Sequence, residues 1–206
     1  MYGQNRSLAD SQITPLACDS YGRLMVNASL DGDLYKAFFP SVAAGANRVY
    51  FDLWNGSTDR IVQIVQVVPV ADGSAAVTGV VGVNLFLTRT TDIGTAGTAA
   101  VAESTALTAT PAISKLDPRT AALPATITAR ALPTGGATAG AVLGFNSQFT
   151  EETSIATYWR SNLLNMPGAY ASPLIVTQGT GIRVVQGSVA SVGNIAFEIL
   201  LSVRRP

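Results

Sequence analysis

The feature that most limits how this chain can fold is a set of short runs in which large apolar residues recur at every second position. The clearest run comes near the C-terminus, where Ile195, Phe197, Ile199, Leu201 and Val203 occupy one face. A period of two sends alternate side chains to opposite faces of a β-strand. Because a strand with one apolar face must bury that face against a second layer, this run predicts a core strand of a layered protein.

Three further runs predict strands in the first half of the chain, at residues 49–54, 61–70 and 77–87. The second run is rich in β-branched residues, which favour an extended backbone. The dipeptide Asn55-Gly56 separates the first two runs and predicts a tight hairpin, because a type I′ turn needs positive φ at both central residues. With a second turn expected at residues 71–74, the three strands are predicted to form a meander.

The remaining strand candidates are residues 23–27, 173–177 and 182–185. Residues 157–165 fit either a short helix or an irregular strand. The total is roughly seven to nine strands with little helix, separated by turn signals about every ten residues. This pattern predicts an all-β fold, either a β-sandwich or a jelly roll.

The chain is expected to divide into residues 1–40, an extended N-terminal arm with a strand pair, and residues 41–206, a single β-sandwich domain. A long Ala/Thr-rich insertion at about 88–143 interrupts that domain, and no aromatic residue occurs between Phe86 and Phe145. A helix over residues 95–107 competes with extended or loop structure here. Threonines and glycines disfavour the helix, so we expect an extended excursion whose best strand lies at 126–132. Long excursions of this kind usually serve a contact or a function.

Composition excludes several classes of function. Charged residues make up 13% of the chain and balance at 13 against 13, histidine is absent, and Cys18 is the single cysteine. Without histidine the chain lacks the commonest general base and metal ligand, so Ser-His-Asp and Cys-His nucleophile systems are excluded. Zero net charge argues against nucleic-acid binding. With neither a spanning apolar run of about 20 residues nor a signal peptide, we expect a cytoplasmic chain in which Cys18 is a buried thiol.

No motif points to a specific chemistry. Asp31-Gly32-Asp33 starts like a calcium loop but lacks the later acidic ligands, so it is interpreted as a polar turn. Glu151-Glu152 would point to opposite faces of a strand. We therefore expect no catalytic residues, no cofactor and no metal site. Trp54, Trp159 and Tyr50 could instead stack on sugar rings, which keeps a carbohydrate-binding module as an alternative.

Two parts of the sequence resemble virion proteins. The segment Asp19–Asn27, with the pattern D-S-x-G-R-L-x-V-N, resembles the opening of small structural proteins of tailed bacteriophages. The apolar strand at 172–176, the Gly-x-Gly-Ile turn at 179–182 and the alternating strand at 194–203 resemble the closing strands of jelly-roll virion proteins. The resemblance implies a non-enzymatic, often trimeric protein of the capsid decoration or head-fibre type, whose arms reach across capsomer boundaries.

A chain with so few charges and no net charge tends to associate, which agrees with that resemblance. We therefore expect a structural protein of a tailed-bacteriophage virion, with a capsid decoration (cement) protein as the first choice. A tail, neck or fibre component is the alternative, beside the carbohydrate-binding module. The expected partners are further copies of the chain, as a homotrimer, and the major capsid protein or another virion protein, without nucleic acid or membrane. The expected location is the virion, after assembly in the host cytoplasm, and no enzymatic activity is expected.

Overall fold

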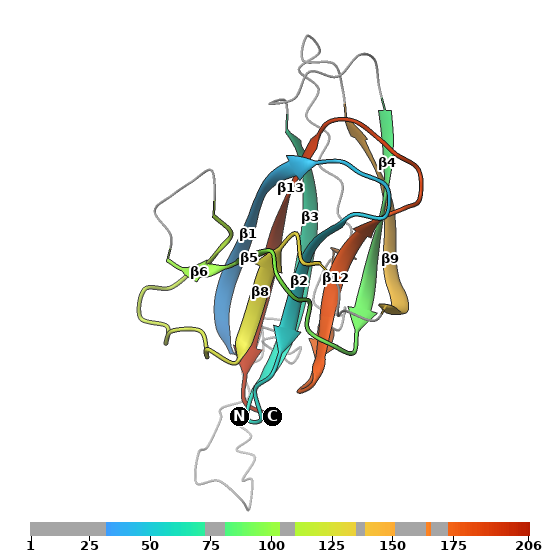
Figure 1. Ribbon diagram of the computed structural model, residues 1–206. Coiled ribbons are helices and arrows are strands. Elements are labelled where there is room, and N and C mark those ends of the chain that lie inside the picture. Colours follow the sequence, from blue (N-terminus) through green and yellow to red (C-terminus); the bar gives the residue numbers. More distant parts are fainter. Residues whose placement is uncertain (1–31, 73–80, 104–109, 135–138, 151–163, 166–172) are drawn as a thin grey trace, which may run out of the picture. The chain divides into compact units, whose positions relative to one another are not determined.

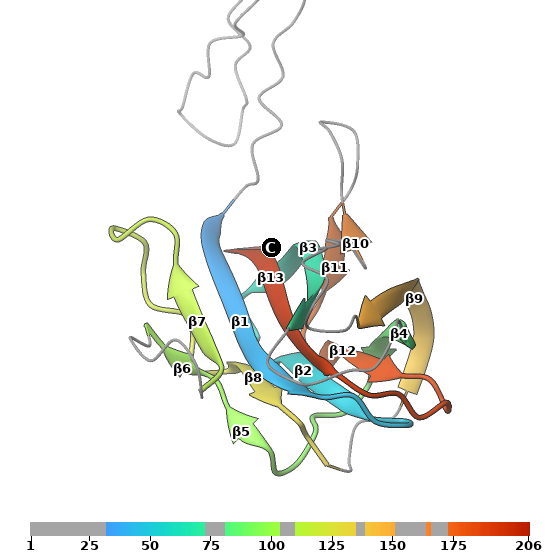
Figure 2. The same cartoon turned by 90° about the horizontal axis from the view of Figure 1, so that it is seen from above.

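The structure of the protein is a computed structural model of two β-sheets packed face to face (Figures 1 and 2). The residues that it describes are 32–72, 81–103, 110–134, 139–150, 164–165 and 173–206. They all belong to one compact unit. No helix occurs in this part of the chain. The predicted all-β sandwich is therefore confirmed.

One layer is a seven-stranded sheet. Its strands are β1 (Asp33–Ala43), β3 (Ile61–Asp72), β6 (Val101–Ala102), β7 (Ala112–Lys115), β10 (Leu164–Asn165), β11 (Leu174–Val176) and β13 (Asn194–Arg204). They lie in the order β10-β3-β13-β1-β7-β6, and β11 also pairs with β3. The pair β6 and β7 is parallel, whereas β1, β3 and β13 pair in antiparallel fashion.

The other layer is a six-stranded antiparallel sheet. Its strands are β2 (Val49–Asn55), β4 (Val81–Thr90), β5 (Thr98–Ala99), β8 (Ile127–Ala131), β9 (Ala139–Thr150) and β12 (Thr180–Gln186). They lie in the order β5-β8-β2-β12-β4-β9. This sheet carries the candidate functional surfaces described below.

The connections between the sheets follow the order of a jelly roll. If β10 and β11 share one position, the sandwich strands in chain order are β1, β2, β3, β4, β9, β10/β11, β12 and β13. In one sheet β1, β13, β3 and β10/β11, which are the first, eighth, third and sixth strands, lie side by side. In the other sheet β2, β12, β4 and β9, which are the second, seventh, fourth and fifth strands, lie side by side. This is the double Greek-key arrangement of jelly rolls.

Aromatic rings join the two layers in the core. Phe39 of β1 stacks on Phe51 of β2 with ring centroids 4.6 Å apart, and Phe51 meets Phe197 of β13 edge-on at 5.4 Å. All five residues of the alternating C-terminal run are buried beside them. The buried face of β13 that the alternation in the sequence predicts is therefore confirmed.

Tyr50 departs from the alternation of β2. Phe51 and Val49 oppose consecutive residues of β12, so Tyr50 is the extra residue of a β-bulge. Its side chain is 1% exposed, and its ring packs against Phe197 at 5.0 Å. The hydroxyl donates a hydrogen bond to Gln186 Oε1 at 2.6 Å, and burial raises the pKa of that hydroxyl to about 12. Tyr50 is a core residue.

The hairpin predicted at Asn55-Gly56 and the meander over residues 49–87 are wrong, because β2 and β3 lie in different sheets. The buried Asn55 side chain instead shapes a loop between the layers. Its Nδ2 donates to the carbonyl oxygens of Arg60 and Val176, each at 3.0 Å, and its Oδ1 accepts the Ser57 N–H at 3.0 Å. The dipeptide marks the end of β2, but the partner of the next strand depends on distant residues.

The sandwich begins before the boundary expected at residue 40. β1 pairs with β13 from Asp33 onward and continues to Ala43. The register shifts between Phe39 and Val42, so Pro40 falls within a bulge, where a proline is tolerated. Residues 33–40 are thus part of the sandwich. The expected arm, its strand candidate at 23–27 and Cys18 lie outside the described residues.

The segment between β4 and β9, residues 91–138, is named the insertion below. It adds β8 and β5 beyond β2 in one sheet, and β7 and β6 beyond β1 in the other (Figure 2). Ile113 and Ile127 pack into the core. The predicted extended structure is confirmed, and the strand expected at 126–132 is β8. The competing helix over 95–107 is absent from its described residues, 95–103.

The C-terminal third agrees with the sequence prediction where the structure describes it. The run at 173–177 contains β11, the run at 182–185 falls within β12, and residues 187–193 connect β12 to β13. Of the segment 157–165, only β10 is described, as a two-residue strand. The turn expected at 71–74 lies largely outside the described residues.

The three side-chain hydrogen bonds of Asn55 predict that its substitution strongly lowers the stability of the protein. Asn55→Ala removes all three side-chain hydrogen bonds and leaves buried partners without bonds, so the free energy of unfolding should fall by about 2–4 kcal/mol. Urea unfolding followed by tryptophan fluorescence measures it. Asn84→Ala is the matched control, since the exposed Asn84 accepts a single bond from Ser147, and it should change stability by less than about 0.5 kcal/mol. Equal effects of the two variants would contradict this account of the loop.

Candidate functional site

A group of charged side chains lies on the outer face of the six-stranded sheet. Asp52 of β2 has Arg130 of β8 and Arg183 of β12 as its two cross-strand neighbours. Asp52 is 2% exposed although it lies on the face opposite the core. The Gly94 N–H covers it and donates a hydrogen bond to Asp52 Oδ2 at 2.7 Å. We name Asp52, Gly94, Arg130 and Arg183 the Asp52 cluster.

The Asp52 cluster fastens the start of the insertion to the sheet. A Cβ atom at position 94 would overlap Asp52 Oδ2 and the Cβ of Pro133, so only glycine allows the backbone to approach so closely. Arg130 Nη1 adds a hydrogen bond to the Ala96 carbonyl oxygen at 3.3 Å. Residues 94–96 are therefore held against β2 and β8 by polar contacts.

Burial dominates the electrostatics of the cluster. It raises the pKa of the Asp52 carboxyl, and the hydrogen bond from Gly94 and the charge of Arg130 oppose that shift. Burial likewise lowers the pKa of the Arg183 guanidinium, and Asp52 opposes it. Asp52 Oδ1, Arg130 Nε and Thr128 Oγ1 have no hydrogen-bond partner among the described residues. Because Gly94 covers the Asp52 carboxylate and blocks access by a substrate, Asp52 is better placed to hold the insertion than to act as a general base.

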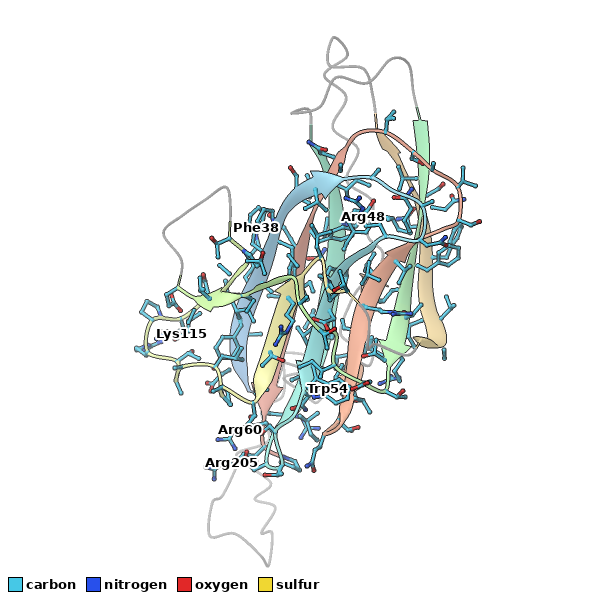
Figure 3. All side chains as sticks on the ribbon, in the orientation of Figure 1. Phe38, Arg48, Trp54, Arg60, Lys115 and Arg205 are labelled. Atoms are coloured by element: carbon cyan, nitrogen blue, oxygen red, sulfur yellow. The ribbon has the colours of Figure 1, made fainter. Side chains whose placement is uncertain are left out.

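The three aromatic residues considered for sugar stacking have different positions. Tyr50 lies in the core, so its interpretation as a stacking platform is wrong. Trp159 lies outside the described residues. Trp54 is half-buried near the end of β2, beside Thr128 of β8 and Gly181 of β12 (Figure 3). A Cβ atom at position 181 would lie 3.0 Å from Trp54 Cε3, so the ring rests on the sheet.

Of the acidic residues considered in the sequence, the structure describes Asp33. Asp33 lies at the start of β1, whereas Asp31 and residues 151–152 lie outside the described residues. Asp33 lines an open pocket of about 420 Å³ with Arg60, Arg204 and Arg205 at the C-terminal end of the chain (Figure 3). In the described ranges no three potential metal ligands cluster, and no helix is long and apolar enough to span a membrane.

Exposed apolar side chains gather at the β9 side of the six-stranded sheet. Val142 and Phe145 of β9 are 60% and 57% exposed, and Phe145 packs against Phe86 of β4 with ring centroids 5.0 Å apart. Val189 and Val192 are exposed in the loop after β12. Exposed apolar residues on the end strand of a sheet are candidates for an interaction surface. The sequence carries a signal for this surface, because residues 139–150 contain two phenylalanines and no charge.

No protein-family model matches the chain, and the comparisons with curated proteins and with solved structures found no match. The fold class stands on the strand order described above. The virion role implied by Asp19–Asn27 and by the C-terminal strands stays a prediction. Of these two segments, Asp19–Asn27 lies outside the described residues, whereas β11, β12 and β13 form the C-terminal pattern.

The raised pKa of Asp52 predicts a specific pH dependence. The folded state binds the carboxyl proton more tightly than the unfolded state, so the wild-type protein loses stability as pH rises above about 3.8 toward the folded pKa. Asp52→Asn has no ionisation and keeps an oxygen for the Gly94 N–H. The difference in free energy of unfolding, Asp52→Asn minus wild type, should therefore increase between about pH 4 and pH 7.

Urea unfolding of both proteins at several pH values gives that difference, in which the other titrating groups cancel. A difference that stays constant or falls with pH would show that the charges of Arg130 and Arg183 lower the pKa of Asp52 at least as much as burial raises it.

Proposed function

We propose that this protein is a structural protein of a tailed-bacteriophage virion, with capsid decoration as its first role and a tail, neck or fibre component as the alternative. The observation that carries the proposal is the jelly-roll strand order. Jelly rolls of eight strands are common in viral capsid and lectin domains. One fold can serve many functions, so the surface chemistry must also support this role.

The chemistry of the described surface supports a mechanical role. The Asp52 carboxylate on the outer face of the sheet is buried beneath Gly94 and accepts a hydrogen bond from its N–H. It therefore contributes to holding the insertion in place. Exposed apolar residues at β9 offer surface that gains roughly 25 cal/mol for each Å² of apolar area removed from water. Cement proteins strengthen a shell through such contacts, which need no catalytic residue and no cofactor.

The lectin-like alternative has less support from the structure. Sugar-binding sites use exposed aromatic rings flanked by polar groups. Of the three residues considered, Tyr50 is in the core and Trp54 is half-buried against Gly181. The structural role is therefore preferred over a carbohydrate-binding module.

The partners proposed with this role are other copies of the chain and the major capsid protein or another virion protein. Low charge and zero net charge favour association. The trimer is what the resemblance to phage proteins implies. In the described part of the insertion, the strands lie on the chain's own sandwich, so a contact with a neighbouring capsomer would use its outward surface.

The proposal is tested in the phage whose genome carries the gene. Mass spectrometry of density-purified virions should detect the protein as a component of the particle. Particles from a deletion mutant should release DNA at a lower temperature than wild-type particles, and adding the purified full-length chain should restore the wild-type temperature. Absence of the protein from purified virions would refute the structural role. Presence with unchanged particle stability would favour the tail, neck or fibre role.

A further inference from the structure

Asn55 and Gly56 form a dipeptide that is prone to spontaneous chemical change. It is the one place in the chain where glycine follows asparagine. Glycine has no side chain to shield its backbone nitrogen, so that nitrogen can attack the side-chain amide of the asparagine before it. Asparagine is accordingly among the thermolabile residue types of proteins. The dipeptide is therefore a candidate site of covalent modification.

The reaction is deamidation through a cyclic imide. The Gly56 nitrogen loses its proton and attacks Cγ of Asn55, so that a bond forms between these two atoms. The bond between Cγ and Nδ2 breaks, and the Nδ2 group takes up a proton and leaves as ammonia. One water molecule then opens the ring at either of its carbonyl carbons, which gives aspartate or isoaspartate at position 55.

In the folded protein, hydrogen bonds hold the attacking nitrogen in place. The Gly56 N–H donates to the Thr126 carbonyl oxygen at 2.9 Å. The backbone just before it is fixed on both sides, because Asn55 pairs with Ile127 of β8 and with Thr180 of β12. Closing the ring requires the Gly56 nitrogen to lose the proton that Thr126 binds and to reach bonding distance of Cγ. The strand pairing therefore opposes the attack.

The amide group that would leave is also buried and hydrogen-bonded. Asn55 is 0% exposed, so solvent does not reach its amide. Nδ2 donates to the carbonyl oxygens of Arg60 and Val176, each at 3.0 Å. The Ser57 N–H, which donates to Oδ1 at 3.0 Å, would by itself assist the attack, because it stabilises negative charge on that oxygen. The other contacts and the exclusion of water oppose it.

The reaction products do not fit the folded site. An aspartate at position 55 carries an oxygen in place of Nδ2, and this oxygen would face the carbonyl oxygens of Arg60 and Val176 without a donor. Burying a carboxylate in such surroundings is strongly unfavourable. An isoaspartate adds a carbon atom to the backbone of β2 and shifts its register against β8 and β12. A chain that reacts while open is therefore hindered from folding again.

We propose that Asn55-Gly56 is a modification site that the fold keeps closed and that deamidates when the end of β2 opens. A buried group reacts in proportion to the fraction of time that its segment spends open. Deamidation at position 55 would thus record unfolding as a lasting covalent change. The inference goes beyond the proposed virion role and does not depend on it.

The first experiment follows deamidation of the full-length protein in mildly alkaline buffer, with and without guanidinium chloride. Peptide mass spectrometry gives the modified fraction at each asparagine, and enzymatic methylation detects isoaspartate. In denaturant Asn55 should react faster than every other asparagine, and without denaturant it should react more than about tenfold more slowly. Asn84, which is exposed and precedes leucine, is the internal control and should stay intact in both. Equal rates at Asn55 in the two states would overturn the proposal.

Gly56→Ala tests the route of the reaction without requiring the variant to fold. Its methyl group shields the attacking nitrogen, so deamidation of Asn55 in guanidinium chloride should slow several-fold. Direct hydrolysis of the side-chain amide would proceed at the same rate in the variant and in the wild type. An unchanged rate would therefore overturn the cyclic route.

The last experiment measures how the product affects folding. Asn55→Asp should unfold at a much lower urea concentration than the wild type. Asn84→Asp is the matched control, since it introduces the same charge at an exposed position and keeps the oxygen that accepts the Ser147 Oγ hydrogen bond. Equal unfolding midpoints for the two variants would overturn the claim that modification hinders refolding.

A variant that fails to fold leaves a direct test on the wild type. After partial reaction in denaturant the protein is diluted into buffer, and the refolded fraction is separated by size-exclusion chromatography. Mass spectrometry should find this fraction depleted in chains modified at position 55. A refolded fraction with the same modified share as the starting mixture would contradict the proposal.

Discussion

The pairing of backbone N–H and C=O groups at the sheet edges is the constraint on which the rest of this structure depends. An open sandwich has four edges, and each edge offers unpaired polar groups to other chains. In the described residues, the insertion covers the β1 and β2 edges by adding β7 and β8, and it then ends each sheet in a strand of two residues. The edge formed by β10 and β11 is short and broken. β9 ends the six-stranded sheet on the other side and is the long end strand of the described part of the chain.

The insertion can cover two edges because polar contacts hold its first residues in place. Gly94 approaches Asp52 more closely than any other residue type permits, and Arg130 binds the Ala96 carbonyl oxygen. Burying a carboxylate costs free energy, and the Gly94 N–H and the arginines recover part of it. The small residues of this segment let β8 pack closely, with Ala129 and Ala131 buried beside Ile127.

Local alternation predicted the inward face of β13 but not the bulge that buries Tyr50 in β2, and it did not predict strand partners. The alternation in β13 identifies its buried side because burial on one face is a property of a single strand. The partner of a strand depends on residues far away in the chain, as with Asp52 opposite Arg183, and no dipeptide encodes it. For the same reason the Asn55-Gly56 signal led to a wrong hairpin. The burial of Asp52 could not be predicted either, because its cover comes from Gly94 in the insertion.

The central claim is that the insertion is held on the sandwich by the close approach of Gly94 to Asp52. Hydrogen–deuterium exchange of the full-length protein and of its Gly94→Ala variant tests it most directly. The account predicts that the amides of β8 exchange faster in the variant than in the wild type, while the amides of the central strand β12 stay slow in both. Exchange in β8 that the substitution leaves unchanged would contradict it.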